Sequence, residues 1–140
     1  MKIAIGCDHA GYLLKEKVKQ HLNNKSIETK DVGAFSEESV DYPDLGHKVA
    51  DSVESKEVDL GIAICGSGNG INITVNKHKG IRAALCWNAE LAALARQHNN
   101  ANIISIPARF ISEEVALECI DAFLSAEFEG GRHQRRIDKI

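Results

Sequence analysis

The sequence has no long apolar run, and this excludes a membrane-spanning helix of the usual length. No stretch of the 140 residues approaches the roughly 20 consecutive apolar residues that a membrane span needs. The first eight residues, Met1 to Asp8, also lack the charged, apolar and small-residue regions of a secretory signal. We therefore expect a cytoplasmic protein that makes no use of a membrane.

The sequence has few cysteines, and their spacing shows no paired motif. The four cysteines are Cys7, Cys65, Cys86 and Cys119, and no two of them form a C-x-x-C motif. In a cytoplasmic chain this pattern indicates free thiols rather than disulfides. The His and Cys residues also lack the spacing of a zinc site, so we expect no metal.

An excess of positive charge is missing as well. The formal net charge is −3, which argues against nucleic acid as a partner. The chain is 44% apolar and 26% charged, enough to bury a core and stay in solution, and its length fits one domain over residues 1–140. The exception to the acidic balance is a short basic tail at residues 132–136.

Short apolar runs alternate with helical patterns along the whole chain. Ser112, followed by Glu113 and Glu114, marks the start of the last clear helix. The predicted strands are 2–7, 27–32, 58–65, 81–86 and 102–106, with a helical pattern after each. This alternation predicts an α/β fold: a three-layer sandwich whose five-stranded parallel sheet has the order 2-1-3-4-5, ending in a C-terminal helix and the basic tail.

A sheet of this order has a topological switch point between its first and third strands. Ligands of open α/β sheets bind there, beyond the carboxyl ends of the strands. The loops at this point are residues 8–11 and 66–70, which also hold the most suggestive side chains of the chain.

The loop 66–70 reads G-S-G-N-G and follows the most apolar strand. Its exposed amides, next to a helix start, suit a phosphate or a developing oxyanion. A tight turn without a ligand is the alternative. The loop is not a dinucleotide fingerprint, because the next strand ends at Cys86-Trp87-Asn88 without a carboxylate, and it is not a P-loop, because no Gly-Lys-Ser/Thr follows.

Cys65 stands directly before this loop. Amides and a helix start favour the thiolate form of a cysteine, which acts as a base or a nucleophile. The alternative is an inert core cysteine, the usual fate of a free thiol. We expect that fate for Cys7, Cys86 and Cys119, which lie inside strands or on an apolar helix face.

Other polar residues sit at strand and helix ends. Asp8 and His9 follow the first strand and face the switch point, although Asp8 could simply cap the next helix. His98 and Asn99 end a helix, where a histidine often only compensates the helix dipole.

Three arginines are candidates for holding a phosphate. Arg109 follows the fifth strand and points to the same edge of the sheet. Arg132 and Arg136 are four residues apart and share a face if the tail is helical. Guanidinium pairs bind phosphate well, but a solvated basic tail is the alternative.

Together these residues resemble one family, the sugar-phosphate isomerases that comprise ribose-5-phosphate isomerase B and the galactose-6-phosphate isomerase subunits. The matching motifs are I-G-C-D-H-A-G at 5–11, D-Y-P at 41–43, C-G-S-G-N-G-I at 65–71, N-K at 76–77, G-I-R-A at 80–83, R-Q-H-N at 96–99, and E-G-G-R-H-Q at 129–134 with Arg136. They cover nearly the whole chain.

The resemblance implies a Rossmann-like domain that forms a homodimer, or a dimer of dimers, with sites at the subunit boundary. It implies an enzyme of the pentose phosphate pathway that interconverts ribose 5-phosphate and ribulose 5-phosphate without a metal or an organic cofactor. Cys65 would move the proton and His98 would assist ring opening, with Ser67 as a further catalytic residue. The implied substrate-binding residues are Asp8, His9, Tyr42, Gly66, Ser67, Gly68, Asn69, Gly70, Asn99, Arg109, Arg132 and Arg136.

The sequence departs from the family pattern at two positions. Ser67 stands where many members have Thr, and both keep a hydroxyl. Members without the loop cysteine use a glutamate just after the loop; here that position is Ile71, which leaves Cys65 as the evident base. The galactose-6-phosphate subunits tend to lack the histidine or the arginine-rich tail that this chain has.

Three other functions stay open at the level of sequence. The substrate could be a six-carbon aldose 6-phosphate, such as that of allose or galactose. The chain could be a non-catalytic, flavodoxin-like phosphate-binding module, which would need the glycine loop but not Cys65 with His98. A thiol-dependent hydrolase would need a base beside Cys65, and no residue is evident in that role.

Overall fold

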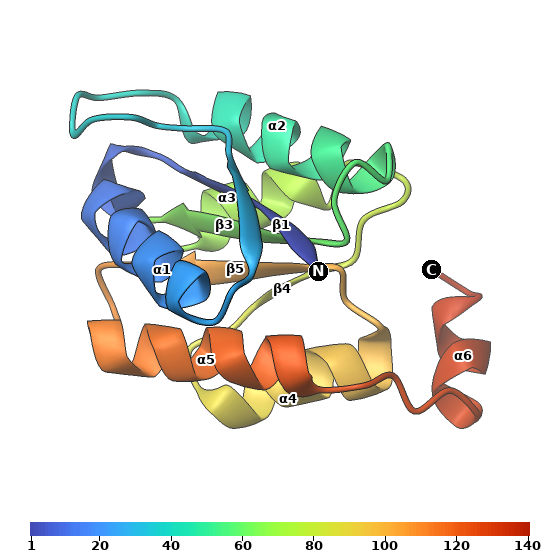
Figure 1. The fold of residues 1–140 in the computed structure, drawn as a ribbon. Coiled ribbons are helices and arrows are strands. Elements are labelled where there is room, and N and C mark those ends of the chain that lie inside the picture. Colours follow the sequence, from blue (N-terminus) through green and yellow to red (C-terminus); the bar gives the residue numbers. More distant parts are fainter.

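Five parallel strands form the central sheet of the computed structural model, which describes residues 1–140 (Figure 1). The strands are β1 (Lys2–Cys7), β2 (Glu28–Asp31), β3 (Leu60–Cys65), β4 (Ala83–Leu85) and β5 (Ile103–Pro107). Every pairing in the sheet is parallel, so each connection crosses back over one face. This confirms the predicted α/β sandwich.

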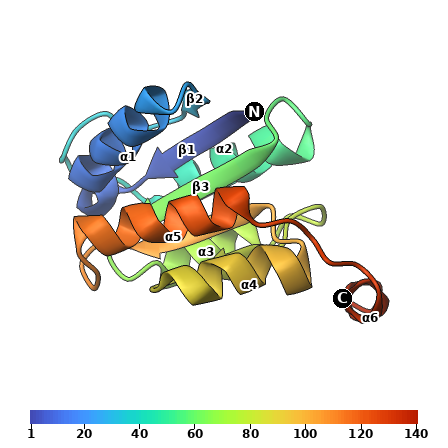
Figure 2. The same cartoon turned by 60° about the horizontal axis from the view of Figure 1, so that its bottom comes forward.

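Helices cover both faces of the sheet. They are the 3-10 turn η1 (His9–Gly11), α1 (Tyr12–Asn24), α2 (Tyr42–Glu54), α3 (Asn69–Val75), α4 (Ala89–Asn99), α5 (Glu113–Ser125) and α6 (Arg132–Ile137). Figure 2 shows α1, α4 and α5 in front of the sheet, with α2 and α3 behind it. No helix is both long and apolar enough to cross a membrane.

Strand β3 divides the core into two parts. Its side chains alternate, so Ile62 and Ile64 join the cluster under α1, α4 and α5, whereas Ala63 and Cys65 join the cluster under α2 and α3. Burying an isoleucine side chain contributes about 1.5–3 kcal/mol. Because of this alternation, Cys65 lies on the α2 and α3 side of the sheet, at the last position of β3.

The strand order is 2-1-3-5-4, and the predicted order 2-1-3-4-5 was wrong in its last two strands. The physical reason is burial. All five residues of β5 are buried, so this strand needs a neighbour on each side, whereas the three residues of β4 are only half-buried and suit an edge. As a result, the loop after β5 lies directly beside the loop after β3.

Side-chain caps mark the starts of two helices, of which the sequence predicts the one at Ser112. The Ser112 Oγ accepts a hydrogen bond from the Val115 N–H (3.2 Å), and the Asn88 Oδ1 accepts one from the Leu91 N–H (2.9 Å). Pro43 lies in the first turn of α2.

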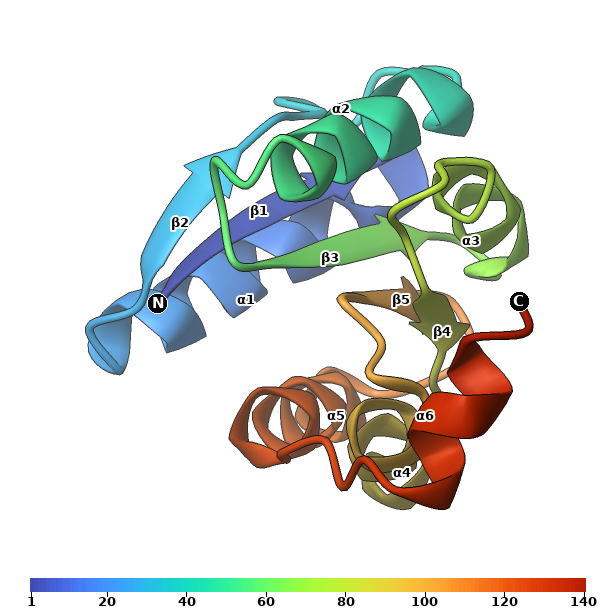
Figure 3. The same cartoon turned by 90° about the vertical axis from the view of Figure 1, so that its right-hand side faces the viewer.

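The basic tail is helical and stands apart from the sandwich. Helix α6 follows Gly130 and Gly131, which both have positive φ, and it packs against α4 at one end of the molecule (Figure 3). Its helical form places Arg132 and Arg136 one turn apart.

Candidate active site

A cavity of about 430 Å³ opens at the carboxyl ends of β1, β3 and β5. This is the edge of the sheet at which ligands of open α/β folds bind. Eight of its nine lining residues are among the predicted ones: Asp8, His9, Tyr42, Cys65, Gly66, Ser67, Gly70 and Arg109. The ninth, Phe110, was missed, because an exposed aromatic side chain after a strand carries no sequence signal of its own.

Cys65 is the only cysteine that lines this cavity. It is 4% exposed, and its carbonyl accepts a hydrogen bond from the Ala108 N–H (2.9 Å), which fixes the end of β3 against the end of β5. By contrast, burial raises the pKa of Cys7 and of Cys119 to about 11, and that of Cys86 to about 12. These three stay protonated at neutral pH, as expected of inert core thiols.

Two glycines determine the shape of the glycine loop, one through its backbone angle and one through a close contact. Gly68 has φ +76°, a conformation that side chains rarely adopt, and it directly precedes α3. A side chain at Gly70 would collide with the ring of Tyr42, so the first turn of α3 lies against the first residue of α2. The Asn69 N–H donates to the Ser67 Oγ (3.2 Å), which leaves the hydrogen of the Ser67 hydroxyl free to donate elsewhere.

Arg109 lies against the same loop. Its N–H donates to the Gly66 carbonyl (3.0 Å), and a Cβ at Gly66 would lie 3.4 Å from the Cδ and Nη1 atoms of the Arg109 side chain. The guanidinium is thus held at the cavity by the pairing of β5 with β3. The corrected strand order explains this contact.

Asp8 and His9 close the other side of the cavity. The Asp8 Oδ1 accepts hydrogen bonds from the N–H groups of Ala10 (2.9 Å) and Gly11 (3.1 Å), so Asp8 does cap the following turn while it also lines the cavity. The Val40 N–H donates to the Nδ1 of His9 (3.3 Å). In the neutral ring the proton is therefore assigned to Nε2, which becomes a donor.

Four of the other predicted residues form a second group at the opposite end of the molecule. His98 and Asn99 end α4, and Arg132 and Arg136 lie on α6, whereas the loops of the cavity lie at the carboxyl ends of the strands (Figures 1 and 2). Asn99 lines a separate hollow of about 350 Å³. None of these four lines the cavity that contains Cys65.

His98 is packed against a residue that sequence reasoning missed. The rings of His98 and His133 stack at 4.1 Å, and the Glu129 Oε2 lies 3.9 Å from the His98 Nε2 and 3.4 Å from the His133 Nε2. Burial, together with the charges of His98 and Arg132, lowers the pKa of His133. The four-residue spacing of Glu129 and His133 was the available signal.

An apolar hollow of about 420 Å³ adjoins the cavity and shares Ser67 and Phe110 with it. Asn69, the one predicted loop residue besides Gly68 that does not line the main cavity, lies here. Trp87 and Phe110 are 54% and 75% exposed at this surface. Large exposed aromatic side chains of this kind mark contact surfaces.

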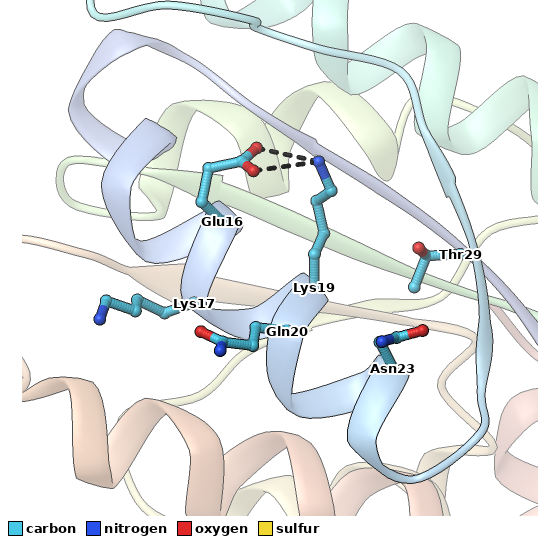
Figure 4. A pocket seen from close by; sticks show the side chains of 6 residues that line it. All are labelled: Glu16, Lys17, Lys19, Gln20, Asn23 and Thr29. Carbon is cyan, nitrogen blue, oxygen red and sulfur yellow. Dashed lines mark hydrogen bonds and ion pairs between the residues drawn. The ribbon is translucent and has the colours of Figure 1, made fainter.

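A further hollow, of about 550 Å³, lies on α1 and β2 (Figure 4). Its six lining residues are all polar, and its Glu16 and Lys19 side chains pair with each other (3.0 Å). It contains none of the predicted site residues, and we assign it no role.

Comparisons with known proteins agree with the sequence resemblance. The family model for Ribose/Galactose Isomerase matches residues 3–140. The chain is 46% identical over 139 residues to the ribose-5-phosphate isomerase B of Escherichia coli (strain K12), covering 99% of this chain and 93% of that protein.

Solved structures give the same result. A ribose-5-phosphate isomerase B from Clostridium thermocellum is 50% identical, with a TM-score of 0.98 over 99% of this chain and 94% of that one. The enzyme of that name from Mycoplasma genitalium, solved with bound ribulose-5-phosphate, is 46% identical, with a TM-score of 0.94 over 99% of this chain and 92% of that one.

Proposed function

This chain belongs to the Ribose/Galactose Isomerase family, and from that premise we propose that it interconverts D-ribose 5-phosphate and D-ribulose 5-phosphate. The observation that carries the proposal is the cavity at the carboxyl edge of the sheet. It holds one thiol, the glycine loop and two phosphate-binding candidates, His9 and Arg109, within a single space.

Proton transfer is assigned to Cys65. The thiolate takes the proton from C2 of the open-chain sugar, which leaves a cis-enediolate across C1 and C2. It returns this proton to C1, and the hydroxyl proton passes from O2 to O1, which gives the ketose. The negative oxygen is stabilised by the free hydroxyl hydrogen of Ser67 and by the amides of the loop from Gly66 to Gly70, except the Asn69 N–H, which donates to the Ser67 Oγ. One group thus carries the hydrogen between adjacent carbons.

Phosphate binding orients the substrate. His9, with Nε2 as a donor, and Arg109, held over Gly66, bind the phosphate at the end of the sugar remote from the reacting carbons. Binding energy from this remote group positions C1 and C2 at Cys65.

The active enzyme is a homodimer whose two sites each take residues from both chains. Ring opening is assigned to His98, and further phosphate contacts are assigned to Arg132 and Arg136. Support comes from their position at the far end of the same chain, from which only a second copy can bring them to the cavity (Figure 1). The exposed Trp87 and Phe110 beside the cavity supply apolar surface for this contact.

The four cysteines support a cytoplasmic location. All four are free and buried, which suits a reducing compartment.

Turnover of Cys65→Ala and Cys65→Ser tests the chemistry. Loss of the base lowers kcat by about 100-fold or more, while ribose 5-phosphate still binds, because the phosphate contacts are intact. Cys119→Ala, which removes a buried thiol from the opposite face of the sheet, keeps its turnover. Turnover by Cys65→Ala close to that of the unmodified enzyme contradicts the assignment.

The same assay, run with a chelator present, decides the substrate. We expect kcat/KM for ribose 5-phosphate to exceed that for allose 6-phosphate and galactose 6-phosphate. The reverse order moves the assignment to a six-carbon sugar phosphate, and no turnover of any of them favours a binding module.

A further inference from the structure

A cluster of metal-ligating side chains lies at the far ends of α2 and α3 from the cavity. His47, Asp51 and Glu54 are spaced four and three residues apart on α2, which places them on one helix face. His78 joins them from the turn that follows α3. The proposed isomerase chemistry uses none of these four residues.

Three atoms of this cluster converge with the spacing of a metal site. The His78 Nδ1 lies 3.0 Å from the Glu54 Oε2 and 3.6 Å from the Asp51 Oδ1, and all three ligand atoms lie within 4.8 Å of one another. In a tetrahedral zinc site with bonds of about 2.0 Å, ligand atoms lie about 3.3 Å apart. The two separations fall on either side of that value.

In two of these residues, the polar atom that does not face the other ligands already has a hydrogen-bond partner. The His78 Nε2 lies 2.8 Å from the His47 Nδ1, and the Gly80 N–H donates to the Glu54 Oε1 (2.8 Å). A metal on Nδ1 leaves the His78 proton on Nε2, where it is donated to His47, the outer-shell arrangement typical of ligating histidines.

We propose that Asp51, Glu54 and His78 bind a zinc ion, with water as the fourth ligand and His47 as the outer-shell partner of His78. Two carboxylates and one neutral imidazole balance the charge of the ion, and both ligand types suit zinc. The proposed site lies outside the His and Cys spacings considered in the sequence, because two of its ligands are carboxylates and the third is 24 residues further along the chain.

The other grouping of this kind, His98 with Glu129 and His133, is a weaker candidate. Its two rings are nearly parallel, with an interplanar angle of 12°. The lone pairs of an imidazole lie in the ring plane, so two stacked parallel rings cannot direct them at one ion without rotating. His78 presents a single ring and needs no such change.

The proposed zinc links two helices that support the glycine loop. Tyr42 and Gly70, in the first turns of α2 and α3, both line the cavity. The two helices pack closely where a side chain at Gly46 would crowd Ile71 and Thr74. An ion held by α2 and by the turn after α3 ties the other ends of the two helices together. It therefore stabilises the helix pair that supports the glycine loop.

Calorimetric titration of the full chain with zinc chloride, after treatment with a chelator and its removal, tests the site. We expect one zinc per chain, and affinity at least tenfold weaker in His78→Gln and in Asp51→Asn. Asp51 is 69% exposed, so Asp51→Asn keeps the fold intact if His78→Gln does not. His21→Gln is the matched control, because His21 also pairs with a carboxylate, that of Asp121 (2.8 Å), but has no third ligand.

Thermal unfolding gives a second readout. Zinc raises the Tm of the unmodified protein and of His21→Gln, because the ion binds the folded state. At the same zinc concentration it raises the Tm of Asp51→Asn by less, because that variant binds the ion more weakly. Unaltered zinc affinity in both His78→Gln and Asp51→Asn overturns the proposal, as does loss of binding in His133→Gln instead. Isomerase turnover enters neither measurement, so the test does not depend on the proposed function.

Discussion

The side chain of Lys15 shows how much one buried residue can fix in this fold. It is fully buried, and its Nζ donates to both oxygens of Asp31, at 2.6 and 2.7 Å, below the rings of Tyr12 and Phe35. Asp31 also accepts the Gly33 N–H (2.9 Å), which anchors the segment that leaves β2. One ion pair thus ties α1 to the segment that follows β2, in which the Val40 N–H donates to His9.

Replacing this lysine tests its contribution to stability. Lys15→Met keeps the apolar volume but leaves Asp31 with Lys19 as its only close cation (2.7 Å). Because Lys19 still compensates the Asp31 charge, losing the Lys15 hydrogen bonds costs about 1.5–3 kcal/mol of unfolding free energy, measured in urea at pH 7. The exposed Lys17→Met is the control, and we expect it to change that free energy by less than about 0.5 kcal/mol.

The pH dependence of this loss has a defined sign. Desolvation raises the pKa of Asp31, but the hydrogen bonds from Lys15 and Lys19 outweigh it and hold the value below the usual one. The pair therefore contributes fully above the unfolded pKa of about 3.9 and is lost as the pH falls through the lower folded value. If the difference in unfolding free energy between the unmodified protein and Lys15→Met stays constant as the pH falls into the acidic range, the ion-pair explanation is contradicted.

At the scale of elements, the glycine loop joins β3 to α3 through a conformation that only glycine adopts readily. Gly68→Ala places a methyl group at φ +76° and against the side chain of Leu85. The backbone alone costs about 1–2 kcal/mol, and the collision adds to it. We expect lower unfolding free energy and lower kcat, because the loop amides shift.

Gly130→Ala separates the two contributions. Gly130 has φ +65° but has no atom near the position of an added methyl group, so this variant carries only the backbone cost. Urea unfolding measures both variants. Equal losses of stability in the two show that the Leu85 contact has no effect.

Much of the element order was accessible from sequence, because the apolar runs are short and the helix starts carry their own signals. Ser112 marks a helix start that the structure confirms, and Pro43 lies in the first turn of another helix. The order of β4 and β5 was not accessible, because it depends on which strand is buried on both sides. The run 81–86 is as apolar as the run 102–106, and only tertiary packing places the first at the edge.

At the scale of the whole molecule, the predicted site residues divide into two sets. Sequence motifs named Cys65 and His98 together, because the resemblance joins them, yet the chain holds them at opposite ends (Figure 1). In the proposed dimer the two sets meet only where two copies of the chain are in contact, and no residue spacing within one chain encodes that contact. The cavity set, in contrast, follows from strand ends and could be predicted.

Mixing two inactive variants tests the shared site. Cys65→Ala and His98→Ala, exchanged in mild denaturant and returned to buffer, form mixed dimers with one intact site each. Equal amounts restore about a quarter of the unmodified turnover, because half of the dimers are mixed. Each variant treated alone stays inactive; a mixture no better than its parents places both residues in the same chain's site.

The placement of α6 links activity to protein concentration. In the shared-site proposal, the groups at the far end of the molecule complete the thiol cavity of a second copy, so one chain alone lacks a complete site. That proposal predicts that turnover per chain falls when the protein is diluted below the concentration at which its dimer dissociates. Dilution then switches the activity off without any ligand or modification.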